Sequence, residues 1–216
     1  MNLPLIIIGA GGHGAVVADA LMAAGGEVLG FTDADVSRCG SIVCGRPVLG
    51  DDRALLAHSP AEVLLVNGLG GIGNTSLDPR RERLQRDLEA QGWTFAAVRH
   101  PSAIVSPYAR VGRGAHLLAA CVVQAGADVG MGCIVNTAAV VEHDVVLGDW
   151  VHVAPGAVLC GGVWVGGRSH IGAGAVVRQG VRLGAETIVA AGAVVVRDED
   201  GGVLVGVPAR RREEHA

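Results

Sequence analysis

The feature that most restricts the fold is a six-residue period in the second half of the chain. Sixteen positions spaced six residues apart, from Val105 to Val195, all hold Val, Leu or Ile. The residue four places after each of the first fifteen is small or β-branched. Neither the 3.6-residue period of an α-helix nor the simple alternation of a strand produces this pattern. A short strand followed by a tight turn does, and glycine is frequent where such a turn needs it.

Repetition at this period predicts a triangular solenoid. Three such segments make one coil of about 18 residues, and the repeats make about five coils. Residue i then lies over residue i+18, at the spacing of neighbouring strands, about 4.8 Å. Side chains that are far apart in the sequence are therefore expected to form columns along the solenoid.

The first hundred residues follow a different pattern, in which apolar strand-like runs alternate with helical ones. This alternation predicts an α/β, Rossmann-like unit with a parallel sheet covered by helices. A strand, a glycine turn and a helix are expected within 3–26, further strands within 27–35 and 61–71, and a surface helix with a basic face within 79–92. The predicted organisation is an α/β domain over 1–100, an all-β solenoid over 101–197 and a C-terminal tail over 198–216.

Composition excludes several classes of protein. The chain has 216 residues, 3% aromatic residues and 34 glycines, so the core must be built from small aliphatic side chains. No apolar run approaches the length of a membrane span, and no signal peptide is evident, which predicts a cytoplasmic protein without membrane insertion. The net charge of -4, without a basic stripe, gives no reason to expect nucleic acid. Five cysteines without CxxC spacing favour reduced thiols over a metal site.

An ionisable triplet, Glu142, His143 and Asp144, interrupts a segment that otherwise avoids charge. The 18-residue stacking places His143 between Ala125 and Gly161, whose small size leaves the imidazole room. An adjacent carboxylate can orient an imidazole and stabilise its protonated form, as general-base catalysis requires. The alternative is a solvated corner of the solenoid, and this alternative is strongest for Glu142.

The segment "GAGGHG", residues 9–14, satisfies the pattern G-x-G-x-x-G between a predicted strand and helix. Backbone N–H groups at a helix N-terminus bind phosphate, and an acidic residue after the second strand can bind a ribose or base. About one hundred residues are too few for two mononucleotide-binding halves, so a nucleotide sugar is favoured over NAD. Glycines kept only for tight packing are the alternative. The predicted nucleotide-sugar contacts are Gly11, Gly12, His13, Asp33 and Gly68.

Several segments carry a resemblance to a known family: "IIIGAGGHGAVVADAL", "HPSAIVSPYARVG", "NTAAVVEHDVVLGDWVHVAPGAVLCGGVWVG" and "GVLVGVPARR". The chain resembles the sialic acid O-acetyltransferase and sugar-nucleotide N-acetyltransferase family, of the bacillosamine and perosamine N-acetyltransferase type. These are hexapeptide-repeat acyltransferases. The resemblance implies a left-handed parallel β-helix that binds acetyl-CoA, and a homotrimer with active sites between subunits.

The resemblance also implies roles for particular residues. His143 matches the catalytic base, and Asp144 matches the acidic residue that raises its basicity, although the bacillosamine enzymes have Glu there. Three positions match contacts to acetyl-CoA: His152, Ala173 and Ala191. We expect the backbone N–H of Gly161 to stabilise the oxyanion at the acetyl-CoA site. Asn136 is a further active-site candidate, and no metal is expected.

The predicted reaction is direct transfer of acetyl from acetyl-CoA to the amine of a UDP- or GDP-linked 4-amino-deoxy sugar. His143 takes the proton of the amine, and Cys160 is better explained by packing than as a nucleophile. Four alternatives stay open: O-acetylation of sialic acid or a related sugar, an NAD-linked oxidoreductase, a metal hydratase, and a noncatalytic sugar-nucleotide binder.

Overall fold

The computed structural model describes residues 3–70 and 79–211 of the chain. Contacts divide these residues into two compact units. Unit 1 holds residues 3–70 and 79–101, and unit 2 holds residues 102–211. Each unit has its own hydrophobic core, and each is described by itself below.

Unit 1 is built on a five-stranded sheet with the order β3-β4-β2-β1-β5. Neighbouring strands are parallel except for β3 and β4, which form an antiparallel hairpin that the sequence pattern did not predict. Ile6 and Ile8 of β1 and Leu65 of β5 are buried in one core cluster, which also contains Leu88 of the helix that follows β5. The bounds of these five strands are β1 Leu5–Ile8, β2 Val28–Thr32, β3 Ile42–Val43, β4 Arg46–Gly50 and β5 Leu64–Asn67. A sixth strand, β6 Val98–Arg99, does not belong to this sheet.

Two α-helices and two 3₁₀ helices complete unit 1. They are α1 Gly12–Ala23, η1 Val36–Arg38, η2 Asp52–Ala57 and α2 Arg80–Ala90. The expected surface helix is only partly at the surface, because Arg81 and Gln85 of α2 are buried. The side-chain amide of Asn67 donates to the Arg81 carbonyl over 2.9 Å, which ties α2 to the end of β5. No helix in the described ranges has both the length and the apolarity needed to cross a membrane.

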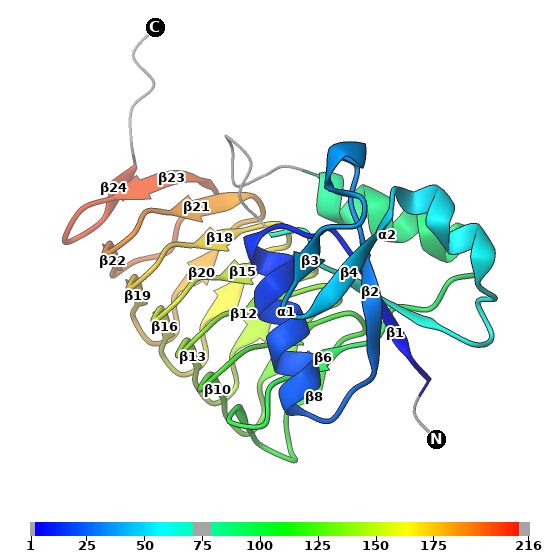
Figure 1. The fold of residues 1–216 in the computed structure, drawn as a ribbon. Coiled ribbons are helices and arrows are strands. Elements are labelled where there is room, and N and C mark those ends of the chain that lie inside the picture. Colours follow the sequence, from blue (N-terminus) through cyan, green and yellow to red (C-terminus); the bar gives the residue numbers. More distant parts are fainter. Residues whose placement is uncertain (1–2, 71–78, 212–216) are drawn as a thin grey trace, which may run out of the picture. The chain divides into compact units, whose positions relative to one another are not determined.

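Unit 2 is a parallel β-helix, and Figure 1 shows its short strands stacked coil upon coil. Almost every strand has two residues and ends on one of the aliphatic residues of the six-residue period. The pairing follows the predicted spacing of 18, as in Val122 with Val140 and Ile134 with His152. From Leu117 onward the periodic aliphatic residues point inward and are buried, so the predicted register is confirmed.

Three sheets form the faces of this β-helix. Sheet I contains β7 Ile104–Val105, β10 Val122–Val123, β13 Val140–Val141, β16 Val158–Leu159, β19 Val176–Val177 and β22 Val194–Val195. Sheet II contains β8 Arg110–Val111, β11 Asp128–Val129, β14 Val146–Leu147, β17 Trp164–Val165 and β20 Arg182–Leu183. Sheet III contains β9 His116–Leu117, β12 Ile134–Val135, β15 His152–Val153, β18 His170–Ile171 and β21 Thr187–Val189.

The segment expected as a C-terminal tail holds two further strands of sheet III. Strand β23 Gly202–Val205 runs parallel to β21, and β24 Arg210–Arg211 runs antiparallel to β23. Leu204 is fully buried in the β-helix core. The hydrophobic core therefore continues past the last repeat of the six-residue pattern.

Candidate active site

His143 and Asp144 lie in the turn that joins sheet I to sheet II, between β13 and β14. The Nδ1 atom of His143 is 2.9 Å from Oδ2 of Asp144, and the two side chains are 57% and 72% exposed. Asp144 has a φ of +58°, a left-handed conformation that Asp tolerates better than most residues. This backbone turn brings the short carboxylate to the ring of its neighbour. The Nδ1–H donates a hydrogen bond to the carboxylate, which leaves Nε2 of the neutral His143 ring free to accept a proton.

The neighbouring coil leaves room for the His143 ring because it has glycine there. A Cβ built on Gly161 would lie 2.5 Å from Cε1 of His143, closer than real atoms approach. The Gly162 N–H donates to the His143 carbonyl over 2.9 Å, which holds the two turns together. Among the described residues, the Gly161 N–H has no backbone acceptor. The predicted stacking of His143 on Gly161 is therefore confirmed.

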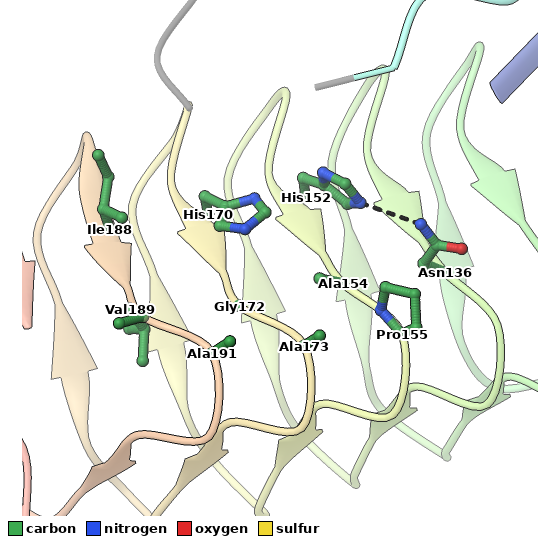
Figure 2. Close-up of a pocket in the computed structure, with 11 residues that line it drawn as sticks. Asn136, His152, Ala154, Pro155, His170, Gly172, Ala173, Ile188, Val189 and Ala191 are labelled. Carbon is green, nitrogen blue, oxygen red and sulfur yellow. Dashed lines mark hydrogen bonds between the residues drawn. The ribbon is translucent and has the colours of Figure 1, made fainter. Parts of the chain in front are cut away.

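A pocket of about 480 Å³ lies at a different corner of the β-helix, where sheet III turns into sheet I. Figure 2 shows the side chains that line it. The structure brings together four of the predicted site residues there: Asn136, His152, Ala173 and Ala191. Gly161 is not among the lining residues, because it belongs to the His143 corner.

The sequence reasoning did not select His170, which also lines the pocket. Its ring lies against that of His152, with 4.9 Å between the centroids and an interplanar angle of 77°. Burial lowers the pKa of His170, so its ring is neutral at pH 7. The 18-residue column that pairs it with His152 was the signal that could have found it.

One corner column of this pocket is formed by Pro155, Ala173 and Ala191. In the described structure, the N–H groups of Ala173 and Ala191 have no backbone acceptor. Proline occupies the same column one coil earlier and has no N–H at all. Two N–H groups of this column are thus without a backbone acceptor among the described residues, at a position of the coil where proline also occurs.

This arrangement gives a prediction for Ala173→Pro. Because Pro155 stands in the equivalent position, the substitution should keep the fold and remove one N–H donor from the pocket. The family resemblance implies that acetyl-CoA contacts Ala173, so we expect the KM for acetyl-CoA to rise about two- to tenfold, the effect of one lost hydrogen bond, with the melting temperature little changed. Steady-state kinetics and thermal unfolding check this, and an unchanged KM would contradict a role for this N–H.

The glycine loop of unit 1 joins β1 to α1. A Cβ on Gly11 or Gly12 would meet nothing within 4 Å, whereas one on Gly14 would collide with the Gly9 carbonyl. The first two positions are therefore open to a ligand, and Gly14 serves the close approach of helix and strand. Burial lowers the pKa of His13 to about 4, with a further contribution from Arg81, so its imidazole is neutral at pH 7.

The side chain of Asp33 is hydrogen-bonded to the backbone of this loop. Its Oδ2 accepts the Ala10 N–H over 2.9 Å and an Arg38 N–H over 3.1 Å. Arg38 also donates to the Ala10 carbonyl over 2.7 Å. Arg38 was not among the predicted site residues, and nothing in the local sequence marks it. Gly68 packs tightly on the end of β1, since a Cβ there would lie 2.6 Å from the Gly9 carbonyl oxygen.

Comparisons with known proteins show which proteins this chain is similar to. Residues 4–86 match the model of the PglD N-terminal domain family. The chain is similar to the acetyltransferase domain of PglB from Neisseria gonorrhoeae FA1090, solved in complex with acetyl coenzyme A, with 38% identity over 98% of this chain and 100% of that chain, and a TM-score of 0.89. A search of curated proteins found no match.

Two further structures cover nearly the whole chain. One is a His-to-Asn variant of perosamine N-acetyltransferase from Caulobacter crescentus in complex with CoA and GDP-perosamine, with 40% identity over 99% of this chain and 100% of that chain, and a TM-score of 0.88. The other is WeeI from Acinetobacter baumannii AYE, with 25% identity over 97% of this chain and 99% of that chain, and a TM-score of 0.84.

An α/β unit followed by a β-helix with a histidine–carboxylate pair at its corner defines a hexapeptide-repeat acyltransferase with a left-handed β-helix. Within that class, the chain belongs to the family of sugar N-acetyltransferases that includes perosamine N-acetyltransferase and the PglB acetyltransferase domain. The predicted family and fold class are confirmed. Within the described residues, no group of three His, Cys, Asp or Glu side chains is placed to hold a metal ion.

Proposed function

We propose that this chain transfers acetyl from acetyl-CoA to the amine of a nucleotide-linked 4-amino-deoxy sugar. The observation that carries the proposal is the contact of 2.9 Å between Nδ1 of His143 and Oδ2 of Asp144, at a corner of the β-helix. A similar protein, perosamine N-acetyltransferase, was solved in complex with CoA and GDP-perosamine. The relative is 40% identical over 99% of this chain. An amine that attacks a thioester loses a proton, and a histidine held by a carboxylate can accept that proton.

In the proposed mechanism the amine attacks the thioester carbonyl, and a C–N bond forms. Nε2 of His143 takes the proton that the nitrogen loses, while Asp144 holds the opposite ring nitrogen. The Gly161 N–H, which has no backbone acceptor in the described structure, stabilises the oxyanion. The C–S bond then breaks, and the imidazolium returns its proton to the departing thiolate.

We assign acetyl-CoA to the pocket at the corner between sheets III and I. Ala173 and Ala191 supply backbone donors there, and His152 and Asn136 lie at its other end. For the nucleotide sugar we propose the glycine loop of unit 1. Gly11 and Gly12 are open to the diphosphate, neutral His13 adds a polar contact, and Asp33 and Gly68 border the loop.

We further propose that the protein is a homotrimer in which each site is shared. His143 and the acetyl-CoA pocket lie at opposite edges of sheet I, so one chain alone does not bring them together. The outer face of sheet I carries a ladder of apolar side chains, which we call the valine ladder: Ile104, Val122, Val140, Val158, Val176 and Val194. Ile104 is 66% exposed, and the valines are half-buried.

Packing of the valine ladder against another copy would set the base of one chain against the pocket of its neighbour. The outer face of sheet II is a poorer candidate, because it holds the Arg110–Asp128 ion pair and the Arg182 guanidinium over Trp164. A continuous apolar face of this kind is typical of an interface.

The double variant Val140→Asp with Val158→Asp tests the shared site. Two carboxylates in the centre of the valine ladder should dissociate the trimer and abolish activity, because unpaired charges are costly to bury. Val146→Asp, on the outer face of sheet II, is the matched control and should stay trimeric. Sedimentation velocity and activity are measured together, and a stable, fully active monomer would refute the shared site.

The proposed reaction is tested by thiol release from acetyl-CoA with a panel of UDP- and GDP-linked 4-amino sugars and free sialic acid. We expect release with at least one nucleotide amino sugar and none with sialic acid. A thermal-shift series with acetyl-CoA and NAD addresses the oxidoreductase alternative, which predicts stabilisation by NAD alone.

A further inference from the structure

The guanidinium of Arg38 is held in one place beside the glycine loop of unit 1. Its Nη1 donates to Oδ2 of Asp33 over 3.1 Å, and its Nη2 donates to the carbonyl of Ala10 over 2.7 Å. Arg38 belongs to η1, the short helical turn that follows β2 and Asp33. Hydrogen bonds to two separate partners fix the plane of this rigid group, so its remaining N–H groups point in set directions.

The carboxylate of Asp33 is occupied by partners within the protein. Its Oδ2 accepts the Ala10 N–H over 2.9 Å in addition to the Arg38 N–H, and its Oδ1 accepts the Asp35 N–H over 3.0 Å. An acidic residue after the second strand can bind the ribose or base of a nucleotide, but here its charge is paired with Arg38. The side chain of Asp33 is 16% exposed and that of Arg38 is 36% exposed, so Arg38 is the member of the pair that a ligand meets first.

Arg38 keeps donors for a ligand. A guanidinium has five N–H groups, of which the hydrogen bonds to Asp33 and Ala10 use two, so three have no acceptor among the described residues. Ala10 directly precedes Gly11 and Gly12, where a Cβ would meet nothing within 4 Å. Arg38 therefore borders the space that we assign to the nucleotide sugar.

The two candidate bases differ in what they offer to a guanidinium. Guanine presents O6 and N7 as adjacent acceptors, and arginine donates to both in a bidentate pair. In uracil each carbonyl stands next to the N3–H donor, for which a guanidinium has no acceptor. The diphosphate and the ribose are the same in both nucleotides. A fixed arginine at the base therefore discriminates between GDP and UDP by hydrogen-bond geometry.

We propose that Arg38 selects the base and that it selects guanine, so that the acceptor of this enzyme is a GDP-linked rather than a UDP-linked amino sugar. This inference rests on the proposed function, because it names the nucleotide of the proposed acceptor. Asp33 and the Ala10 carbonyl hold the guanidinium, and its outer N–H groups donate to O6 and N7 of the base.

Nucleoside diphosphates test this contact on the unaltered protein, by calorimetry without acetyl-CoA. We expect GDP to bind at least about tenfold more tightly than UDP, the discrimination of a bidentate pair. The analogue 7-deaza-GDP, which has C–H in place of N7, should bind about two- to tenfold more weakly than GDP. Inosine diphosphate keeps both acceptors and should bind as GDP does. Equal binding of UDP and GDP, equal binding of 7-deaza-GDP and GDP, or a loss confined to inosine diphosphate would overturn the inference.

Arg38→Lys tests the residue itself. Lysine keeps the positive charge next to Asp33, but it is a point donor without the planar fork. The affinity for GDP should fall about tenfold while that for UDP changes less than about twofold, so the preference is lost. The matched control is Arg53→Lys, because Arg53 is also ion-paired, with 2.7 Å between its Nη2 and Oδ2 of Asp51. This control should keep the preference, and an equal loss for both nucleotides in Arg38→Lys would contradict base selection.

Acetyl transfer separates this inference from the proposed function. A UDP-linked amino sugar acetylated with a kcat/KM at least equal to that of its GDP-linked counterpart would overturn the inference and leave the proposed function standing. A preference for GDP in the binding assay, without acetyl transfer to any nucleotide amino sugar, would support the inference and contradict the proposed function.

Discussion

Replacement of His143 by alanine should lower kcat by about 10²- to 10⁴-fold, the usual contribution of a positioned general base. The reason is that Nδ1 of His143 is hydrogen-bonded to Asp144, so Nε2 is the ring nitrogen that can accept the proton of the amine. The KM for acetyl-CoA should change little, because His143 does not line the pocket at the other corner of sheet I. Steady-state kinetics with both substrates check the two parts of this result.

The matched control for His143→Ala is Glu142→Gln, which removes the charge of the adjacent residue. Glu142 follows the periodic Val141, and its carboxylate accepts a long hydrogen bond from the His143 backbone N–H, with 3.4 Å between Oε2 and the nitrogen. Such a surface change should alter kcat by no more than about twofold. Unchanged turnover in His143→Ala, or an equal loss in Glu142→Gln, would contradict the assignment of the base.

Gly161→Ala should lower kcat by about 10²-fold. The variant adds one methyl group, at a position 18 residues after His143 in the sequence but next to its ring in the structure. The new Cβ would lie 2.5 Å from Cε1 of His143, so the ring must move away. Displacement of a catalytic group by about 1 Å is enough for such a loss. Because the His143 side chain is 57% exposed and can rotate, the melting temperature should fall little.

The control for this variant is Gly167→Ala, at the same place in the repeat but at another corner. A Cβ there would lie 3.1 Å from the Asp149 carbonyl oxygen and far from the imidazole. Its effect should be confined to a small change in stability, with kcat preserved. Equal activities of the two variants would show that the His143 ring does not depend on the space above Gly161.

The stacking of His143 on Gly161 could be predicted from the sequence because the six-residue period fixes which residues lie in one column. The positive φ at Asp144 belongs to the same repeat, because positions six residues apart from Gly114 to Gly192 all have positive φ. The direction of the Asp144 side chain toward His143 could not be predicted from the repeat, since it is a matter of side-chain rotamer. Within the pocket, the same spacing of 18 residues pairs His152 with His170, so His170 could have been selected from the sequence. It could not predict the Asn136 amide orientation, which a single hydrogen bond to Thr137 decides.

Unit 1 was less predictable for a related reason. The glycine pattern correctly placed a loop between β1 and α1, but Arg38 reaches Ala10 from 28 residues away through a turn without any repeat. The hairpin of β3 and β4 follows that turn, and β3 has two residues, which is too short a strand to be recognised by alternation. Asp33 was predicted as a nucleotide contact, and its bonds to the loop backbone give it a structural role in addition.

The most direct test of the proposed function is the identity of the product. Wild-type protein, acetyl-CoA and each member of a panel of UDP- and GDP-linked 4-amino sugars are incubated together, and the product is examined by mass spectrometry and NMR. The account predicts an N-acetylated nucleotide sugar, with one CoA thiol released for each acetyl group transferred, and no product with the His143→Ala variant. Acetyl found only on a hydroxyl, or no acetylated sugar anywhere in the panel, would contradict it.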